Sequence, residues 1–490
     1  MDFLLTIYFL LLAAIVAGLM AYEYLVGKKD LLCIRNFFLL GFIVFQLTSA
    51  TIPLITQDTR PYMLRDLTGT AAMYAVWSTI FVVVFLLTSA KGWVARPLAR
   101  WMPTTHVIPS VPMMLVLAFV LTAAAVVLHQ VVVYVPLIGV VGDYFAIAFA
   151  AIACGLVGWV WAPRLMNPLV VAIVCVIVLA NAANVVTGSF GRRQLIAVAG
   201  GLVWGMYYSH WRYLPVRKII GPITAVAAVP VIALALYTSV RSSKEHDRSA
   251  TEHVQAMKSQ GDVKSGLIML LDGQGTALKS MWLMENHPEN FEHRHLFIIR
   301  YAVIFPIPRS VWADKPDPLS TKIANMAMRR QVNRDRLTIG PGIVGHAAAE
   351  GGFYALIVYA VLMGMIVRFL DELVLKNPYT PFVVLPVGCA LGQVLGMPRG
   401  ETSVFMFILL FSVVGSYLVM QILVKMIGSS GMVRAEASAA DAAGWGGASP
   451  SYAAWDGHAA DEEAHVYGEE YGESSGDQGY AQPQGRPDSA

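Results

Sequence analysis

The sequence predicts an all-α polytopic membrane protein with about eleven transmembrane helices, one large outer loop and a disordered C-terminal tail. The 490 residues have a mean hydropathy of +0.59, and only 14% of them are charged. A soluble domain has about a quarter of its residues charged. Apolar segments of about 20 residues, the length that crosses a bilayer, recur along the chain. The longest polar stretches are one internal segment and the C-terminal end.

The predicted spans are residues 3–26, 32–55, 69–90, 112–130, 141–162, 168–187, 194–211, 219–240, 346–368, 380–397 and 402–425. The first of these is too long for a signal-peptide core and has neither a basic start nor a convincing cleavage site, so we expect it to be retained. Helix breaks near 131–143 and within 380–402 are the least regular points of this pattern.

Basic residues predict the orientation, because short cytoplasmic loops are enriched in lysine and arginine. Loops that contain Lys28 and Lys29, or Lys91, Arg96 and Arg100, alternate with loops poorer in cations. This pattern places the N-terminus and the loop 241–345 outside and the C-terminus inside. The chain is thereby divided into an N-terminal bundle (1–240), the outer loop (241–345), C-terminal transmembrane helices (346–426) and a tail (427–490).

The outer loop is expected to fold, whereas the tail is not. Within the loop, residues 267–271 and 277–284 have helix-like apolar content, residues 296–307 resemble an interfacial piece ended by prolines, and residues 321–336 resemble a basic amphipathic helix. The tail is rich in Ala, Gly, Ser, Glu and Tyr and is acidic. It cannot bury enough apolar surface to fold, and we expect it to be disordered and cytoplasmic.

Arginines recur at the predicted outer helix ends, namely Arg193, Arg300, Arg309 and Arg399. A guanidinium offers planar, bidentate donors and stays charged, so such a group suits a pyrophosphate. The alternative is that these cations only anchor the helices by snorkelling to the interface. Snorkelling cations concentrate on the cytoplasmic side, which favours the pyrophosphate interpretation.

His346 and Glu350 follow a turn of glycines and a proline and are spaced i, i+4, so they share one helix face. Such a pair at the membrane boundary can activate a hydroxyl as a general base, and a carboxylate in a spanning segment is a functional candidate. The alternative is structural pairing, with Glu350 bonded to an arginine.

Other chemistry has weaker support in the sequence. His287, His293 and His295 form a poor metal signal, and we expect no metal and no cofactor. Walker, Rossmann and Asp-x-Asp motifs are absent, which argues against direct use of ATP or a nucleotide sugar. In the first outer loop, Asp58 or Asp66 is a rival candidate for a base, although pairing with the nearby arginines is the simpler interpretation. We expect no nucleic-acid partner.

Ile307 is followed by the sequence Pro-Arg309-Ser-Val-Trp312-Ala-Asp-Lys315-Pro, which ends at Pro316. It resembles the Pro-Arg-x-x-Trp-x-x-Lys-Pro signature of the Wzy-type O-antigen and capsule oligosaccharide repeat-unit polymerases of bacteria. The many helices and the late outer loop are also similar. The family has an acidic residue closer to the turn glycine, where this chain has His346. The resemblance covers about a quarter of the chain.

The resemblance implies a GT-C-like glycosyltransferase of the bacterial inner membrane, with the loop in the periplasm. Its substrates would be undecaprenyl-pyrophosphate-linked oligosaccharides, joined by a metal-independent, inverting displacement. Arg309 and Arg399, with Arg193 and Arg300, would stabilise the departing pyrophosphate, and His346 or Glu350 would accept the proton. Lys315 would contact phosphate or fix the loop, and Glu401 would orient Arg399. A flippase and a chain-length regulator would be protein partners.

Three other functions fit the sequence less well. An O-antigen ligase would use the same donor but transfer the glycan to a lipid acceptor. A transporter or flippase would have charges near the membrane midplane and an inverted repeat, and we find no repeat. A scaffold subunit of an envelope assembly would tolerate replacement of Arg309 and Arg399.

Overall fold

The computed structural model describes residues 1–60, 62–105, 108–135, 139–186, 193–240, 250–271, 275–328, 339–428 and 433–434. All of them belong to one contact unit, Met1–Glu436. The predicted disordered tail lies outside the described residues except for the end of the last helix and a two-residue strand. The C-terminal half of the amphipathic helix predicted at 321–336 also lies outside them.

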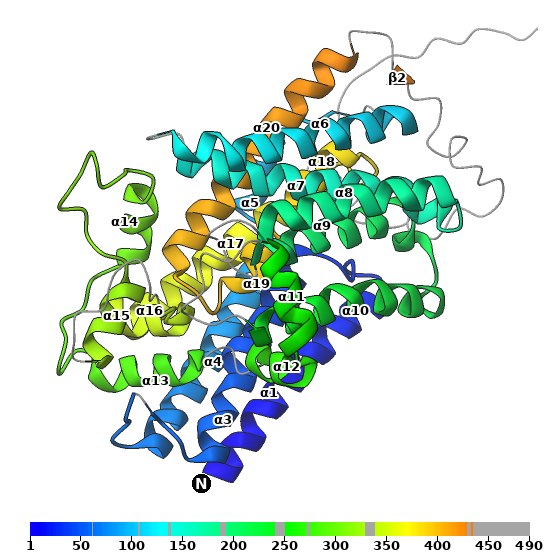
Figure 1. Cartoon of the computed structure of the whole chain (residues 1–490). Helices are drawn as coiled ribbons and strands as arrows, with labels where there is room; N and C mark the ends of the chain where they lie inside the picture. Colours follow the sequence, from blue (N-terminus) through cyan, green and yellow to red (C-terminus); the bar gives the residue numbers. More distant parts are fainter. Residues whose placement is uncertain are drawn as a thin grey trace, which may run out of the picture. The chain divides into compact units, whose positions relative to one another are not determined.

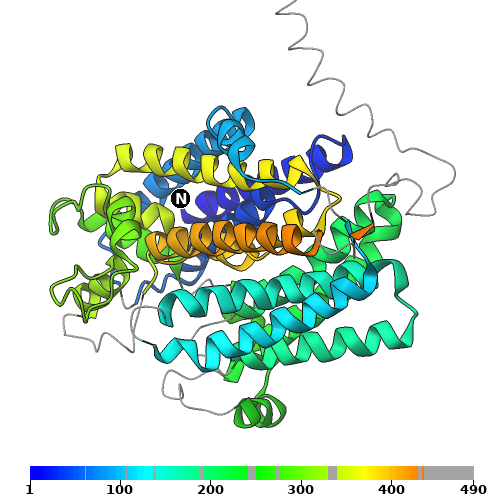
Figure 2. The ribbon, with the colours of Figure 1, turned by 90° about the horizontal axis from the view of Figure 1, so that it is seen from above.

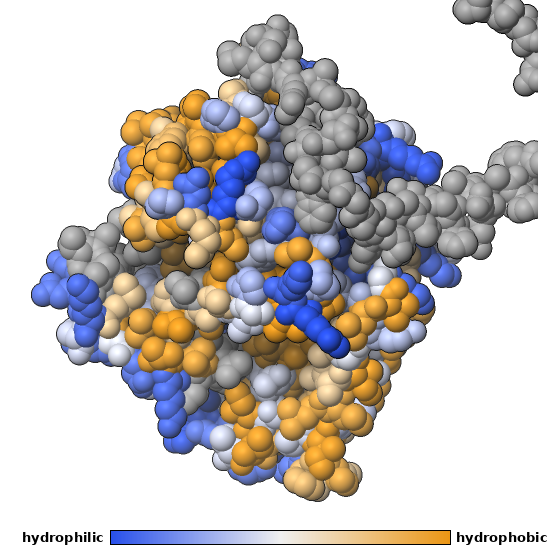
Figure 3. Space-filling view, turned by 90° about the vertical axis from the view of Figure 1, so that its right-hand side faces the viewer, coloured by the Kyte–Doolittle hydropathy of each residue, from blue (hydrophilic) through white to orange (hydrophobic). Residues whose placement is uncertain are grey.

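Helices make up about four fifths of the described residues, as the composition predicts. Within the part of the chain that the structure describes, nine helical segments are long and apolar enough to cross a membrane. They are α1 (Asp2–Leu25); α2 (Ile34–Phe42), which continues through the π-helical turn η1 (Ile43–Thr48) into α3 (Ser49–Thr56); α4 (Leu67–Lys91); α6 (Val111–Gln130), with the 3-10 turn η2 (Val132–Tyr134); α7 (Gly139–Trp161), with the 3-10 turn η3 (Ala162–Arg164); α8 (Pro168–Val186); α10 (Val216–Val240); α17 (Phe353–Lys376); and α20 (Thr402–Gly428). Apolar side chains cover much of the face in Figure 3, as expected for a surface that contacts lipid.

The other two predicted spans correspond to shorter helices. Residues 194–211 form α9 (Arg193–Ser209), which is followed by the 3-10 turn η4 (Trp211–Tyr213). Residues 380–397 form two pieces, α18 (Pro381–Gly388) and α19 (Leu391–Gly396), with Pro386 inside the first. The polytopic membrane architecture is therefore shown, whereas the count of eleven stays a prediction.

The predicted span 346–368 begins later in the structure, at Phe353. Gly352 has φ +67°, a left-handed conformation that interrupts the helix, and residues before it form the separate short helix α16 (Gly342–Glu350). The remaining loop helices are α11 (Ala250–Gln260), α12 (Val263–Leu271), α13 (Thr276–Asn286), α14 (Phe297–Ile304) and α15 (Leu319–Met328). Figure 1 shows α13 to α16 gathered at one side of the helices.

Three short elements complete the described fold. Helix α5 (Ala95–Trp101) follows α4, and the two-residue strands β1 (Ile108–Pro109) and β2 (Val433–Arg434) pair antiparallel. The pairing places Ile108 opposite Arg434, so the segment after α20 lies beside the connection between α5 and α6.

Small residues allow α7 and α9 to pack backbone against backbone. A Cβ atom at Gly201 would collide with the carbonyl oxygen of Ala151, and one at Gly205 with that of Gly155. The spacing of Gly201 and Gly205 is the small-xxx-small pattern that lets transmembrane helices approach closely. Helix α9 is thereby held inside the bundle although it is only 17 residues long. Figure 2 shows α7 with α6 and α20 beside it.

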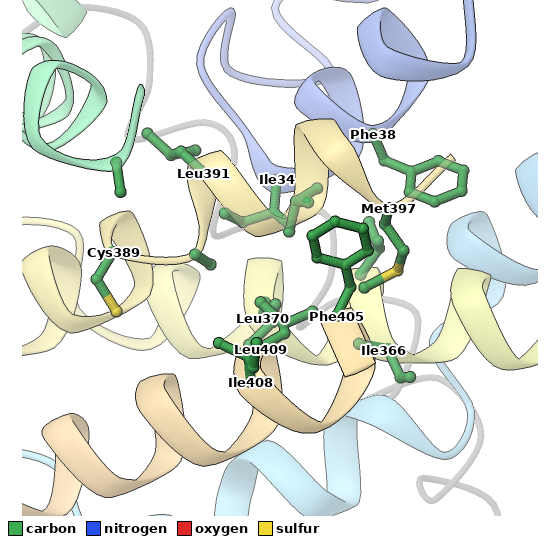
Figure 4. Packing of buried hydrophobic residues seen from close by; sticks show 14 of the residues in the cluster. Ile34, Phe38, Ile366, Leu370, Cys389, Leu391, Met397, Phe405, Ile408 and Leu409 are labelled. Atoms are coloured by element: carbon green, nitrogen blue, oxygen red, sulfur yellow. The ribbon is translucent and has the colours of Figure 1, made fainter. Parts of the chain in front are cut away.

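A second packing centre lies beneath the turn that leads into α20. Ile34 and Phe38 of α2, Leu370 of α17, Met397 after α19 and Phe405 of α20 are all buried and converge there (Figure 4). The turn is also bonded to the second span, because the Gln46 side chain in η1 donates to the carbonyl oxygen of Pro398 and accepts from the Tyr74 hydroxyl. The turn that carries Glu401 is therefore fixed from both sides.

Replacing Gly205 with isoleucine should destabilise the protein by about 1–3 kcal/mol or more, because the added side chain forces α7 and α9 apart. Thermal unfolding in detergent measures this effect. Gly221→Ile is the matched control, since no atom lies within 4 Å of a Cβ atom built at Gly221. Equal melting temperatures for the two variants would show that the α7–α9 contact contributes nothing.

Candidate functional site

The predicted pair His346 and Glu350 lies at the centre of a buried charged cluster. The pair belongs to α16, whose first residue, Gly342, has φ +70° and follows Pro341. His346 Nδ1 lies 2.7 Å from Glu350 Oε1, and both side chains are fully buried. His346 Nε2 lies 3.4 Å from Oε1 of Glu401, in the turn before α20. One imidazole thus joins two carboxylates, which we call the Glu-His-Glu chain (Glu350, His346 and Glu401).

Each carboxylate of the Glu-His-Glu chain also binds the start of a loop helix. Glu350 Oε2 accepts the N–H of Ile298, the second residue of α14, at 2.7 Å. Glu401 Oε2 accepts the N–H of Ser320, the second residue of α15, at 2.7 Å. Negative charge is stabilised by the free N–H groups at helix starts. The Glu-His-Glu chain therefore attaches two loop helices to the helices that enter the membrane.

The rest of the Glu350 carboxylate is satisfied by α17, whose Tyr359 hydroxyl donates to Oε2. Glu401 Oε1 accepts from the Ser403 hydroxyl at 2.8 Å. Glu401 is 9% exposed, whereas His346 and Glu350 are both 0% exposed. Glu401 is therefore the member of the chain that reaches the surface. The pairing of Glu350 found here is with His346 and Tyr359 rather than with an arginine.

The charge of His346 is set by its two carboxylate neighbours. Burial alone lowers the pKa of this imidazole, but Glu401 and Glu350 outweigh burial and raise the pKa above the ordinary value of 6.5. Nε2 faces both the Glu401 carboxylate and the N–H of Thr402, at 3.3 Å. The protonated ring donates to Glu401, whereas the neutral ring accepts from Thr402, so one proton decides between the two contacts.

Arg294 lies beside this chain and was not singled out from the sequence. Its guanidinium stacks 3.6 Å from the centre of the Phe297 ring and donates to the carbonyl oxygen of Asp317 at 3.4 Å. It lies within electrostatic reach of Glu350 and Glu401. Arg294 is half-buried and so presents a cation at the edge of the cluster.

The Pro-Arg motif folds into a closed turn. Arg309 Nη2 pairs with Asp317 Oδ1 at 2.6 Å, and Nη1 donates to the carbonyl oxygen of Lys315 at 3.0 Å. Lys315 Nζ donates to the carbonyl oxygens of Phe305 (2.6 Å) and Ile307 (2.9 Å) and lies over the Phe305 ring. Lys315 is buried, the geometry expected if it fixes the loop. Arg309 remains 40% exposed and available to a ligand.

Tyr301 links the closed turn to the Glu-His-Glu chain. Its ring lies 5.6 Å from Lys315 Nζ, and its hydroxyl is within electrostatic reach of Glu401 and Arg309. Burial, reinforced by Glu401, raises the pKa of Tyr301 to about 12, so the phenol stays protonated at neutral pH. Arg309, Arg294 and Glu401 therefore belong to one charged region.

The other predicted arginines lie in different settings. Arg300 is exposed on α14, and Arg399 is half-buried with its guanidinium 5.4 Å from the centre of the Phe45 ring. The backbone of Arg193 begins α9, but its side chain lies outside the described residues, as does Arg192. The predicted role of Glu401 in orienting Arg399 stays untested, since the contacts described for Glu401 are with His346, Ser320 and Ser403.

A second buried ionisable pair was also missed from the sequence. His129 Nδ1, at the end of α6, lies 2.6 Å from Asp143 Oδ1, near the start of α7. The next residue, Tyr144, packs against Phe305 of the closed turn and against Phe407 of α20, with ring centres 6.4 Å apart in both cases. A lone aspartate in an apolar segment is itself a sequence signal, because such charges are costly in a membrane.

The three histidines considered as a metal signal lie near one another but do not form a ligand set. Ring centres are 6.1 Å apart for His287 and His293, and 6.3 Å apart for His293 and His295. Within the described part of the chain, no three His, Cys, Asp or Glu side chains converge as metal ligands would. In the first outer loop, Asp58 pairs with Arg60, while the Asp66 side chain caps α4.

No family model, curated protein or solved structure matches this chain.

Replacing Glu350 with alanine should lower the free energy of unfolding by about 3–5 kcal/mol, because His346 Nδ1, the Ile298 N–H and the Tyr359 hydroxyl all lose their buried carboxylate partner. Thermal unfolding in detergent is the measurement. Asp58→Ala removes a carboxylate from an exposed pair with Arg60 and should leave the melting temperature unchanged. A melting temperature of Glu350→Ala equal to the wild type would contradict a stabilising role for the chain.

The raised pKa of His346 predicts a pH dependence of stability. The folded state holds the proton more tightly than the unfolded state, so its stabilisation is complete below about pH 6.5 and is lost as pH rises through the folded-state pKa. We expect the melting temperature to fall as the pH rises above about 6.5. His346→Gln should reduce this slope, and an unchanged slope would assign the effect to other groups.

Proposed function

We propose that this protein is a membrane glycosyltransferase that polymerises undecaprenyl-pyrophosphate-linked oligosaccharide repeat units into a surface polysaccharide. The observation that carries the proposal is the closed turn of the Pro-Arg-x-x-Trp-x-x-Lys-Pro motif. It holds Arg309 partly exposed within the charged region that contains Arg294 and Glu401. Within this proposal the helical domain is GT-C-like, the loop is periplasmic in the bacterial inner membrane, and the tail is cytoplasmic.

The reaction is a single inverting displacement at the sugar C1. The acceptor hydroxyl oxygen forms the new C1–O bond, the bond from C1 to the pyrophosphate oxygen breaks, and lipid pyrophosphate leaves with the electron pair. Charge develops on the leaving oxygen, so fixed cations there lower the barrier. In the proposal Arg309 and Arg294 meet this pyrophosphate, and Arg399, Arg300 and Arg193 extend the cradle. Arginines supply the counter-charge, so the step is metal-independent.

The proton of the acceptor hydroxyl goes to the Glu-His-Glu chain. Glu401 is buried but keeps 9% of its surface exposed, and the fully enclosed His346 and Glu350 act through it. When Glu401 receives the proton of the acceptor hydroxyl, the protonated His346 ring can release its own proton to Glu350, because the three groups titrate together. This arrangement refines the expectation that His346 or Glu350 contacts the hydroxyl directly, because neither has exposed surface.

The decisive test is polymer formation by purified protein from lipid-pyrophosphate-linked repeat units, with a chelator present. Wild type should give a ladder of products. Arg309→Ala should lower the rate by about 10²–10³-fold, the effect of removing one donor to a developing anion. Arg60→Ala, which removes an exposed arginine from another outer loop, is the matched control and should retain the wild-type rate.

The outcomes separate the alternatives. No ladder from wild type on a substrate that a known polymerase accepts would overturn the polymerase proposal, and glycan transfer to a lipid acceptor would then support a ligase. A full ladder from the double variant Arg294→Ala with Arg309→Ala would remove the cradle from the mechanism. No ladder from wild type, together with only a modest change in melting temperature when Arg309 and Arg399 are replaced with alanine, would favour the scaffold interpretation.

A further inference from the structure

A groove at one end of the spanning helices is separate from the charged region described above. It has a volume of about 400 Å³ and is walled by the end of α4, by the residues that lead into α5 and by the middle of α17. Its sides are apolar, formed by Val84, Leu87, Val361 and Met365, whereas Lys91 and Arg368 line one end. An apolar groove that ends in cations matches the shape of a phospholipid, with an acyl chain below an anionic head group.

The cations at the end of the groove outnumber the carboxylates they contact. Arg368 Nε and Arg96 Nε bond the same oxygen of Glu372, at 2.7 Å and 3.1 Å. Lys91 lies 4.7 Å from the ring centre of Trp93. Arg368 and Arg96 thus share one carboxylate, and Lys91 adds a third cation, which leaves an excess of two positive charges beside the groove.

Gly92 brings this charged group directly to the groove. It lines the groove and has φ +61°, the left-handed conformation that ends α4. A Cβ atom there would lie 3.1 Å from Arg368 Nε and 3.4 Å from both Arg96 Nε and a Glu372 oxygen. The absence of a side chain at this position lets the guanidinium groups reach the groove.

The surroundings indicate the membrane interface. Trp93, just before α5, and Trp101, the last residue of α5, are 76% and 82% exposed. Exposed tryptophans of this kind sit at the level of lipid head groups. The positive-inside rule assigns this end to the cytoplasmic leaflet, whose lipids are the more anionic.

We propose that this groove binds one acidic phospholipid, with an acyl chain along Val84, Leu87 and Val361 and its phosphate beside Lys91 and Arg368. The proposal stands independently of the proposed enzyme activity. The alternative is non-specific anchoring, in which the cations only hold the helices in any bilayer. That alternative predicts no preference for anionic lipid and no effect of filling the groove.

The test uses full-length protein, stripped of lipid in detergent and then given phosphatidylglycerol, phosphatidylcholine or inorganic phosphate. Native mass spectrometry counts retained lipid, and thermal unfolding measures stabilisation. We expect one tightly retained phosphatidylglycerol and a higher melting temperature with that lipid alone. Lys91→Ala should weaken retention about fivefold, the contribution of one cation near a membrane surface. Val361→Trp should abolish retention by filling the groove while keeping every cation.

Arg60→Ala, which removes a cation at the opposite end of α4, should retain the lipid as the wild type does. Equal stabilisation by phosphatidylcholine, or full retention in both Lys91→Ala and Val361→Trp, would overturn the proposal. Stabilisation by inorganic phosphate equal to that by phosphatidylglycerol would also overturn it, because the acyl chain would then play no part. If Lys91→Ala does not fold, Lys91→Gln and Val361→Trp provide the same comparison.

Discussion

Two carboxylates that share one buried imidazole hold the large loop onto the spanning helices. Without Glu350, the start of α14 and the Tyr359 hydroxyl of α17 would both lose a partner. Without Glu401, the start of α15 would lose its partner, and so would the imidazole. Buried charges persist only when they are fully paired, so these contacts depend on one another. The closed turn is therefore positioned by the two helices that flank it, α14 and α15.

Rigid packing beneath the cluster makes such pairing possible. The turn that bears Glu401 rests on buried side chains from α2, α17 and α20 (Figure 4). The contact of α7 with α9 through glycines fixes the neighbouring wall of the bundle. Charged groups need placement to within a fraction of an ångström to stabilise a transition state, and an immobile support provides it. The exposed Arg309 and the Glu401 carboxylate, which keeps 9% of its surface exposed, rest on this support.

The hydropathy pattern predicted the membrane architecture because a span needs only length and apolar composition. The i, i+4 spacing of His346 and Glu350 predicted their shared helix face, because this spacing is a local property of a helix. The approach of Glu401 could not be predicted, because it depends on a tertiary contact between α16 and a distant turn. Arg294 was missed for a similar reason, since its stacking on Phe297 follows two left-handed residues, His295 and Leu296. The start of the α17 span shifted because a glycine pair interrupts an otherwise continuous apolar segment.

The π-helical turn η1 constrains the length of the second span as well as its composition. A π-helical turn contains one residue more than the α-helix would use, and it rotates the chain on one side relative to the other. Gln46 lies in this turn and bonds both Pro398 and Tyr74. Deleting one residue from η1 would restore a regular helix and turn Gln46 by about 100° away from Pro398. Insertions and deletions in this apolar segment should therefore be selected against, even at lipid-facing positions where any hydrophobic residue would be tolerated.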